Sequence, residues 1–599
     1  MRERVERWIA DDPDPETRAA LAGLCARAFG AAEDPSDRDA ARDALRERFD
    51  HPLAFGTAGL RGPVGAGPGR MNRAVAMRTT AGLCAYLEAE VPDAAARGII
   101  VGHDARPTSR RLAEDVAEVA AGAGMRVLAF EEPTPTPLVA FALRALDAAA
   151  AVVVTASHNP PQDNGYKVFW SHGGQIVPPH DAGITAAIAR TGGARSIPRC
   201  PLADAARDGR YERVPAEIVD RYVRGVAGLR RAPRATPPAP LRIAYTALHG
   251  VGASVTRRAF AASGLPPLLE VAAQVDPDGT FPTVRSPNPE SPEALTELVA
   301  LAEATRADLA LAHDPDADRL GVLVRAGGGA LRRLSGDEIG CLLGSYLLEG
   351  AAEDAHAGGQ PVVLSTVVSA TKLGAIAAAR GARWEQTLTG HKWIHARAVE
   401  LEASGYRMVF GYEEALGYAV WPAVRDKDGI SAAVVFADMA TALAARGQTV
   451  WDALVALWRA HGMSLSAQVS VPFDRPGGAA AMRALVARCV DAPPRSLAGH
   501  ALVRVDDLAR AVTHPVTPGG TLGPGEPLPW RPAPLAVLHL EGGHRAMLRP
   551  SGTEPKLKLY FEVAEHLDDA EPVAAAEARA KGRIDALEQA LMDALDIDG

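Results

Sequence analysis

A serine and a histidine stand side by side in the segment Thr155–Pro160, which reads Thr-Ala-Ser-His-Asn-Pro. The segment follows six apolar residues, and a short apolar run bounded by turn residues predicts a buried strand. In open α/β sheets, ligands bind at the carboxyl ends of strands. Ser157 could therefore act as a nucleophile or carry a phosphoryl group if another group activates it. The alternative is an Asn-Pro turn whose serine only caps the next segment.

Three aspartates alternate with other residues in a second segment, Asp-Pro-Asp-Ala-Asp-Arg, which also follows an apolar run. In an extended loop alternate side chains share a side, so these carboxylates can converge on a cation: Asp314, Asp316 and Asp318. A few hard oxygen ligands suit Mg²⁺. An EF-hand is excluded, because its sixth position needs glycine and holds Arg319, and its twelfth needs glutamate and holds Arg325. A solvated acidic turn is the alternative.

A third segment, Arg549–Lys556, reads Arg-Pro-Ser-Gly-Thr-Glu-Pro-Lys near the C-terminus. A guanidinium, two hydroxyls, a glycine and an ammonium are the parts of a phosphate clamp. It is not a nucleotide P-loop, because the pattern G-x-x-x-x-G-K-[ST] is absent. We expect phosphate to be bound by Arg549, Ser551, Gly552, Thr553 and Lys556, with a plain turn as the alternative.

A fourth segment, Gly411–Tyr418, holds the adjacent acids Glu413 and Glu414 between glycines. Such a loop suits hydrogen bonds to sugar hydroxyls, and Arg425 and Lys427, which follow it, could hold a second phosphate. Taken alone this pattern is weak, because two glutamates are usually just solvated.

Together, and in this order, the four segments resemble the α-D-phosphohexomutase superfamily, which includes phosphoglucomutases and phosphomannomutases. The resemblance begins at Phe55–Gly62, which reads Phe-Gly-Thr-Ala-Gly-Leu-Arg-Gly, and runs to Tyr560. That opening and the Glu-Glu-Ala loop look most like the branch that contains phosphoglucomutase 2 and phosphopentomutase. The resemblance implies three successive mixed α/β domains and a smaller C-terminal α+β domain around a central cleft.

The implied function is a phosphosugar mutase that interconverts sugar 1-phosphate and sugar 6-phosphate, with glucose or mannose as the sugar. The alternative sugar is ribose or deoxyribose, with the 5-phosphate as product. Phosphorylated Ser157 would pass its phosphoryl group to the sugar, and the bisphosphate would return the other one. One Mg²⁺ per chain, bound by Ser157 and the three aspartates, and a sugar 1,6-bisphosphate activator are expected. A metal-dependent phosphatase and a non-catalytic sugar-phosphate sensor are the alternatives from other classes.

The resemblance also implies roles for single residues. Arg61 would stabilise charge, and either His158 or Lys167 would accept the proton. The close branch usually has an aromatic residue at the position of His391, and many hexose enzymes have serine at the position of Ala415, so the sugar stays open. The expected substrate-binding residues are Thr57, Arg319, Thr389, Gly390, His391, Lys392, Glu413, Ala415, Arg425 and Lys427.

The amino-acid composition argues against some classes of binding partner. The chain has 599 residues, of which 47% are hydrophobic and 23% charged, so it can be globular throughout. A net charge of −9 without a basic run argues against nucleic acid and anionic membranes as partners. The resemblance implies small phosphosugars as partners, and we expect a monomer or homodimer. Five widely spaced cysteines, no secretory signal and no long apolar stretch indicate a cytoplasmic protein.

These motifs need elements to position them. Residues 1–50 are expected to form a helical extension, with helical spacing in Thr17–Phe29 and Asp39–Phe49. Strand and helix patterns then alternate, which predicts a mostly parallel sheet, over Ile99–Val101, Ser109–Ala123, Arg126–Phe130, Thr136–Leu146 and Ala149–Val154. The pattern restarts near residues 241 and 361.

The expected domains are residues 51–231 with the serine loop, 241–335 with the metal loop, 336–465 with the sugar loop and 466–599 with the phosphate loop. The proline-rich stretch 232–240 is read as a linker. Val516–Pro534 is expected to be an irregular insertion, and Glu571–Leu595 a helix.

Overall fold

The computed structural model describes residues 1–30, 34–56, 59–231, 241–353, 358–473, 477–551 and 556–597. The chain forms two compact units. The first contains Met1–Arg333 and Ala415–Ala445, and the second contains Leu334–Glu414 and Arg446–Gly599. Within the described ranges, every helix is too short or too polar to cross a membrane. The predicted linker, residues 232–240, lies outside the described residues.

The first unit begins with three helices, which are α1 (Arg2–Asp11), α2 (Pro15–Phe29) and α3 (Pro35–Phe49). Their apolar faces share a small core of Val5, Leu21, Leu45 and Phe49. The two predicted helices correspond to α2 and α3, but each begins earlier, at a proline. An aspartate caps each of these starts and accepts a hydrogen bond from the backbone, which explains the earlier start.

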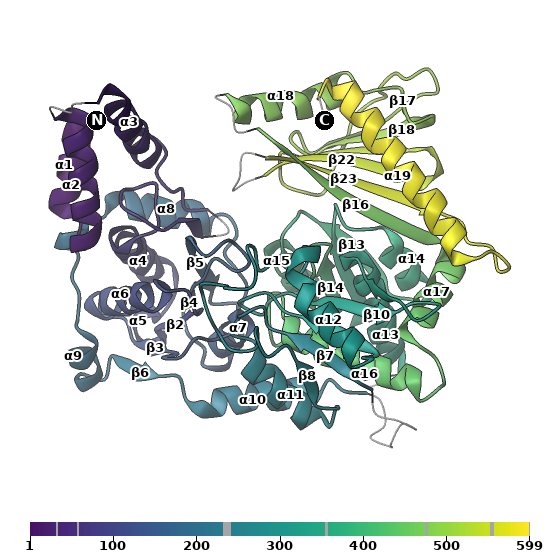
Figure 1. Ribbon diagram of the computed structural model, residues 1–599, viewed down its shortest axis with the longest axis horizontal. Helices are drawn as coiled ribbons and strands as arrows, with labels where there is room; N and C mark the ends of the chain where they lie inside the picture. The colour runs from purple at the N-terminus through teal and green to yellow at the C-terminus, as the bar shows by residue number, and fades with distance from the viewer. Residues whose placement is uncertain are drawn as a thin grey trace. The chain divides into compact units, whose positions relative to one another are not determined.

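A six-stranded sheet follows, in the order β1-β5-β4-β2-β3-β6 (Figure 1). Strands β2, β3, β4 and β6 are parallel, while β5 runs antiparallel to β4 and β1 runs antiparallel to β5. Every residue of β4 is buried, as the apolar run predicts. The strands are β1 (Leu60–Pro63), β2 (Ile99–His103), β3 (Val127–Ala129), β4 (Ala150–Val154), β5 (Asp163–Trp170) and β6 (Tyr211–Arg213). The helices are α4 (Arg73–Glu90), α5 (Ala94–Arg97), α6 (Ser109–Gly122), α7 (Thr136–Ala145), α8 (His180–Arg190), α9 (Leu202–Arg207) and α10 (Ala216–Ala227).

A second sheet of the same unit has five strands in the order β11-β10-β9-β7-β8. Its central strands β7 and β9 are parallel and fully buried, and the predicted metal loop follows β9 directly. The strands are β7 (Ile243–Thr246), β8 (Leu268–Glu270), β9 (Leu309–Ala312), β10 (Gly321–Arg325) and β11 (Leu331–Arg333). The remaining elements are α11 (Ala253–Ser263), α12 (Thr296–Ala304), β15 (Gly417–Ala419) and α16 (Gly429–Ala444).

In the second unit, β12 pairs in parallel with both β13 and β14. These strands are β12 (Gln360–Thr366), β13 (Arg383–Thr387) and β14 (Tyr406–Glu413). Four helices accompany them, α13 (Gly336–Glu353), α14 (Lys372–Ala379), α15 (His391–Ala403) and α17 (Val450–His461). The start of α17 is secured by a reciprocal capping box between Thr449 and Asp452.

The C-terminal part of the second unit is an antiparallel sheet in the order β16-β23-β22-β21-β18-β19-β20. Figure 1 labels β16, β18, β22 and β23 of this sheet. The predicted C-terminal helix is α19 (Val573–Leu595), which buries one stripe at helical spacing. The predicted irregular insertion contains one short strand, β20. The elements are β16 (Met463–Pro472), α18 (Gly478–Asp491), β17 (Ser496–Leu497), β18 (His500–Asp507), β19 (Val512–Pro515), β20 (Glu526–Pro527), β21 (Ala536–Leu540), β22 (Arg545–Pro550) and β23 (Lys556–Glu565).

Candidate active site

Ser157 lies in the turn after β4 and is 3% exposed. Its backbone adopts φ 53°, a left-handed conformation that is uncommon for a residue with a Cβ and often marks functional sites. The amide of Ser157 donates to Thr155 Oγ1 at 2.9 Å, which stabilises the turn. The hydroxyl of Ser157 is thereby held at the carboxyl end of the strand.

Arg106 holds this turn from the neighbouring strand end. Its guanidinium donates to four backbone carbonyl oxygens of the serine loop, those of Ser157 (2.8 Å), Asn159 (2.6 Å), Pro160 (2.6 Å) and Asp163 (2.9 Å). It also pairs with buried Asp104, whose carboxylate accepts hydrogen bonds from Thr155 and Ser109. Sequence reasoning missed both residues, although they directly follow β2 and the strand-end rule applied to β4 could have found them.

The hydroxyl of Ser157 donates to Asp314 Oδ2 at 2.7 Å. The metal loop and the serine loop of the first unit therefore meet. One oxygen from each of Asp314, Asp316 and Asp318 lies within 4.8 Å of the others, and all three side chains are buried. The left-handed backbone of Ala317, with φ 57°, lies within this turn.

These residues fit a hard divalent cation. Within the described part of the chain, neither Asp316 Oδ1 nor Asp318 Oδ1 accepts a hydrogen bond, although both atoms are buried. Buried carboxylate oxygens without donors are costly unless a cation compensates them. The aspartate triad can therefore hold a metal ion beside Ser157.

Two lysines approach the same carboxylates. Lys167, in β5, lies 2.6 Å from Asp316 Oδ2 and 3.1 Å from Asp318 Oδ2, and Lys427 lies 3.2 Å from Asp318 Oδ2. Burial alone would lower the pKa of Lys167, but Asp316 and Asp318 outweigh it and raise the pKa above its usual value. Lys167 is thus a charged ammonium in this structure.

The surroundings of Asp314 and Asp318 shift the pKa values of these two aspartates in opposite directions. Burial and the neighbouring aspartates raise the pKa of Asp314 well above its usual range. Burial would also raise the pKa of Asp318, but Lys167, Lys427 and Arg319 outweigh it and lower the value. Of these two carboxylates, Asp314 therefore has its negative charge compensated less by nearby cationic side chains.

His158 and Arg61 complete the surroundings of Ser157. His158 Nδ1 lies 3.1 Å from Ser157 Oγ, and Arg61 NH1 donates to Asn159 Oδ1 at 3.0 Å. Desolvation by the protein, followed by Arg319 and Arg61, lowers the pKa of His158 well below its usual value. The imidazole is therefore neutral at pH 7. Arg319 donates its backbone N–H to Asp314 Oδ1 and pairs with Glu290.

The segment that carries Arg425 and Lys427 is anchored in the first unit. Buried Asp426 accepts a hydrogen bond of 2.8 Å from Gln175 Nε2, and Arg425 NH1 donates to His172 O at 3.4 Å. The sequence pattern did not single out Asp426, yet it lies between two predicted substrate-binding residues and bonds to Gln175.

Half of the expected substrate-binding residues belong to the second unit, namely Thr389, Gly390, His391, Lys392 and Glu413. Glu413 ends β14 and is buried, while the chain passes from the second unit to the first between Glu414 and Ala415. Glu414, which is not among the expected substrate-binding residues, accepts hydrogen bonds from Thr366 and Ser369. Burial and Glu413 raise the pKa of Glu414 to about 7.

Thr389 and Gly390 precede α15, and Gly390 adopts φ 114°, a conformation that favours glycine. His391 and Lys392 form the first turn of that helix. His391 is buried and its ring centroid lies 5.7 Å from that of His395.

The strands on either side of the phosphate loop, β22 and β23, pair with each other in antiparallel orientation. Arg549 is the last residue but one of β22, and Lys556 is the first residue of β23. The backbone amide of Ser551 donates to the carbonyl oxygen of Lys556 at 2.8 Å. Three expected site residues, Thr57, Gly552 and Thr553, lie outside the described residues.

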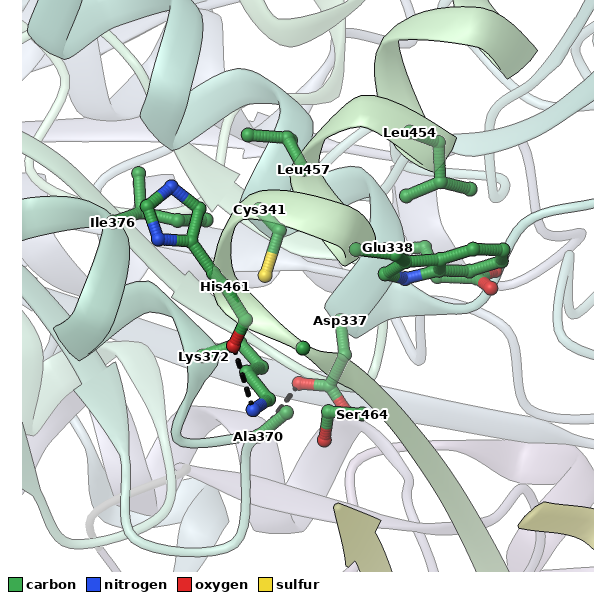
Figure 2. Close-up of a pocket in the computed structure, with 12 residues that line it drawn as sticks. Asp337, Glu338, Cys341, Ala370, Lys372, Ile376, Leu454, Leu457, His461 and Ser464 are labelled. Atoms are coloured by element: carbon green, nitrogen blue, oxygen red, sulfur yellow. Dashed lines mark hydrogen bonds between the residues drawn. The ribbon is translucent and has the colours of Figure 1, made fainter. Parts of the chain in front are cut away.

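A small pocket in the second unit is lined by none of these residues. It is lined by Asp337, Cys341, Lys372, Trp458 and His461, among others (Figure 2). Its volume of about 20 Å³ has room for roughly one water molecule. The pocket is therefore a packing feature and not a substrate site.

Comparisons with known proteins find matches to one protein family along most of the chain. Four family profiles match in order: Phosphoglucomutase/phosphomannomutase alpha/beta/alpha domain I at residues 52–194, domain II at 220–328, domain III at 335–461 and the C-terminal domain at 531–580. A probable phosphomannomutase of Haemophilus influenzae is 38% identical over 496 residues, covering 82% of this chain and 93% of that protein.

A human phosphopentomutase is 35% identical over 551 residues, which cover 89% of this chain and 88% of that protein. Among solved structures, a phosphoglucomutase/phosphomannomutase family protein of Burkholderia thailandensis matches with a TM-score of 0.63 and 21% identity. That match covers 91% of this chain and 97% of the other, and supports the fold. The chain belongs to the phosphoglucomutase/phosphomannomutase family.

Proposed function

We propose that this chain is a phosphosugar mutase that interconverts the 1-phosphate and 6-phosphate of glucose, mannose or both through a phosphoserine and a sugar bisphosphate. The observation that carries this proposal is the 2.7 Å hydrogen bond from Ser157 Oγ to Asp314, beside two buried carboxylate oxygens without donors. Phosphoryl transfer depends mainly on positioning and charge stabilisation, and this cluster offers both.

In the first step, the phosphoryl group of phosphorylated Ser157 passes to the free hydroxyl of the sugar. The P–O bond to Ser157 breaks while a P–O bond to the sugar forms. The sugar hydroxyl loses a proton and Ser157 Oγ gains one, so no proton is released overall. His158, with Nδ1 3.1 Å from Ser157 Oγ, is close enough to exchange that proton.

In the second step, the sugar bisphosphate presents its other phosphate to Ser157 and the same exchange runs in reverse. Arg61, Lys167 and Arg319 contribute positive charge around the transferred group. Lys167 acts here as an ammonium, because Asp316 and Asp318 both pair with it. The phosphate that does not move would be held by Arg549, Ser551, Gly552, Thr553 and Lys556.

One Mg²⁺ per chain would be held by Asp314, Asp316, Asp318 and the phosphoserine, where it would neutralise charge on the transferring group. A sugar 1,6-bisphosphate would act as activator, because it can phosphorylate an unmodified Ser157 and leave as the monophosphate. We place the reaction in the cytoplasm, since all five cysteines are free thiols.

A phosphopentomutase is the second candidate, because a human phosphopentomutase is 35% identical over 89% of this chain. A ³¹P NMR time course with Mg²⁺ and a trace of glucose 1,6-bisphosphate separates the candidates. Glucose, mannose and ribose 1-phosphates are compared, with Ser157→Ala as the control. Faster conversion of the hexoses supports the first proposal, and faster conversion of ribose the second. Release of free phosphate would support a phosphatase instead.

A further inference from the structure

Thr136 bonds directly to one of the three aspartates of the metal loop. Its hydroxyl donates to Asp316 Oδ2 at 2.6 Å, and its backbone amide donates to the carbonyl oxygen of Asp316 at 3.0 Å. Both residues are fully buried, although 180 positions of the chain separate them. Thr136 therefore holds both the backbone and the side chain of Asp316, a residue that the proposed mechanism uses as a metal ligand.

Thr136 belongs to a segment with little conformational freedom. Residues 133–137 read Pro-Thr-Pro-Thr-Pro, and each proline fixes its own φ and restricts the residue before it. The segment is attached to the end of β2, because the Thr134 amide donates to His103 O at 2.8 Å. Thr136 is the first residue of α7, and every residue of this helix from Thr136 to Leu143 is buried. The hydroxyl of Thr136 is therefore presented to Asp316 from a fixed position.

The hydrogen-bond donors around Asp316 distinguish its two carboxylate oxygens. Oδ2 accepts from Thr136 Oγ1 and from Lys167 Nζ, each at 2.6 Å. Oδ1 is buried and has no hydrogen-bond donor among the described residues. An oxygen with two close donors has little capacity left for a cation. Oδ1 is therefore the oxygen of Asp316 that remains for a metal ion.

Asp318 shows the same distinction between its oxygens, but with lysines as the donors. Its Oδ2 lies 3.1 Å from Lys167 Nζ and 3.2 Å from Lys427 Nζ, while its buried Oδ1 has no donor in the described part of the chain. A lysine ammonium is a point charge on a flexible stem, whereas the threonine hydroxyl is attached at Cβ. Of these donors, Thr136 is thus the one whose position the backbone fixes.

The number of free oxygens on each carboxylate affects which cation the site prefers. A carboxylate with one oxygen already engaged binds a cation through the other oxygen alone. Mg²⁺ requires near-ideal octahedral geometry, whereas Ca²⁺ takes more oxygen ligands in flexible geometry and often binds both oxygens of one carboxylate. Aspartates that each offer a single oxygen from a fixed position therefore favour Mg²⁺ over Ca²⁺.

We propose that Thr136 is a positioning residue that sets the metal preference of the aspartate triad. Because its hydroxyl engages Oδ2, Asp316 binds a cation through Oδ1 only, which suits Mg²⁺ better than Ca²⁺. Without the hydroxyl, Oδ2 keeps only the flexible ammonium of Lys167, and the carboxylate can turn to offer both oxygens. This inference rests on the metal site of the proposed function, but not on the sugar or on phosphoryl transfer.

Equilibrium binding of the two cations tests the inference. The unfolding temperature of the full-length chain, with Ser157 unphosphorylated by intact mass, is measured at increasing concentrations of magnesium or calcium chloride and gives each Kd. The test variant is Thr136→Val, which keeps the branched shape and the backbone amide but removes the hydroxyl. The Kd of Mg²⁺ should rise by about tenfold or more, as is usual when an outer partner of a metal ligand is lost. The Kd of Ca²⁺ should rise by a smaller factor, because Ca²⁺ can use the released oxygen.

Three further variants make the result interpretable. Thr136→Ser keeps the hydroxyl and should keep the parent ratio of the two Kd values. Thr136→Ala also removes the hydroxyl, and it carries the test if Thr136→Val does not fold. The matched control is Thr79→Val, which removes a buried hydroxyl of α4 that donates to Val75 O of the same helix at 2.8 Å and should change neither Kd.

The inference is overturned if removal of the hydroxyl leaves the ratio of the two Kd values unchanged. An equal rise of both would mean that Thr136 only maintains the metal loop. A parent protein that binds the two cations equally, or binds neither, would also overturn it. Mutase turnover is measured separately, so a parent that prefers Mg²⁺ but converts no sugar phosphate would count against the proposed function alone.

Discussion

The hydroxyl of Ser157 lies 2.7 Å from Asp314 Oδ2, although 157 positions of the chain separate the two residues. The contact joins the end of β4 in one sheet to the end of β9 in another. Asp314 is also the carboxyl whose pKa burial and its neighbours raise most clearly. The serine loop and the metal loop therefore form one site in the first unit.

The first prediction concerns Ser157 itself. Ser157→Ala should remove detectable interconversion of glucose 1-phosphate and glucose 6-phosphate, because no other hydroxyl lies against Asp314 in the described structure. Incubation with glucose 1,6-bisphosphate should add one phosphoryl group to the parent protein and none to the variant, as measured by intact mass. A phosphorylated, active variant would show that another residue carries the group.

The second prediction concerns the metal. Saturating Mg²⁺, at 100 times its Kd, should raise the free energy of unfolding by about 2.7 kcal/mol. Asp316→Asn with Asp318→Asn should lose this increase, because both orphaned carboxylate oxygens are affected. A chelator should stop turnover and Mg²⁺ should restore it. Thermal unfolding with and without Mg²⁺ checks the prediction.

The control for the metal prediction is Asp506→Asn, a buried aspartate of the second unit that pairs with His539. It should keep the full response to Mg²⁺. The triad would be excluded as the metal site if the double variant and the control responded alike.

The third prediction concerns Arg106. Arg106→Lys keeps the charge but cannot reach four carbonyl oxygens of the serine loop at once. We expect kcat to fall by about 10²-fold, because small displacements of a reacting group have effects of that size. The KM for glucose 1-phosphate should stay nearly constant, since Arg106 bonds to the protein backbone.

Steady-state kinetics of Arg106→Lys are compared with those of Arg73→Lys, which disturbs an ion pair between helices α4 and α6 of the same unit that does not bond to the serine loop. The control should keep the parent kcat. A rise in KM with unchanged kcat for Arg106→Lys would contradict the positioning role.

The fourth prediction concerns pH and Glu414. Burial and Glu413 raise the pKa of Glu414 from 4.5 to about 7, so the folded protein holds a proton that the unfolded chain has lost between these values. Stability that depends on this proton is complete below pH 4.5 and is lost as pH rises through 7. Glu414→Gln, which cannot titrate, should reduce the decline in unfolding free energy between pH 5 and 8.

Chemical denaturation at several pH values measures that slope. Glu338→Gln, which replaces another buried glutamate of the second unit, serves as the control for the loss of a carboxylate as such. Identical slopes for the parent and Glu414→Gln would refute the assignment.

Several parts of the molecule follow from sequence pattern. Family membership, the mixed α/β fold class and the class of reaction are confirmed by the matching profiles and relatives. The apolar run before Ser157 is β4, and the run before Asp314 is β9. The domain boundaries and the roles of the site residues stay predictions.

Helix starts were predicted less well. The periodic segments in residues 1–50 missed the first turns of α2 and α3, because capping aspartates and prolines begin a helix before its apolar stripe does. Strand β5, which carries Lys167, was also not predicted, since it interrupts the alternation of strand and helix with an antiparallel neighbour.

The sequence by itself determined the chemical groups and the strand ends that present them, because periodicity and turn chemistry depend on neighbouring residues. Only the tertiary structure brought Lys167 to Asp316, 149 positions away, Arg106 to the carbonyls of the serine loop, and Arg545 to the carbonyl oxygen of Val367. These contacts depend on strand order, register and side-chain packing between distant segments. The local sequence pattern does not determine which distant segments come into contact. The burial of these side chains and their partners are therefore known only from the folded structure.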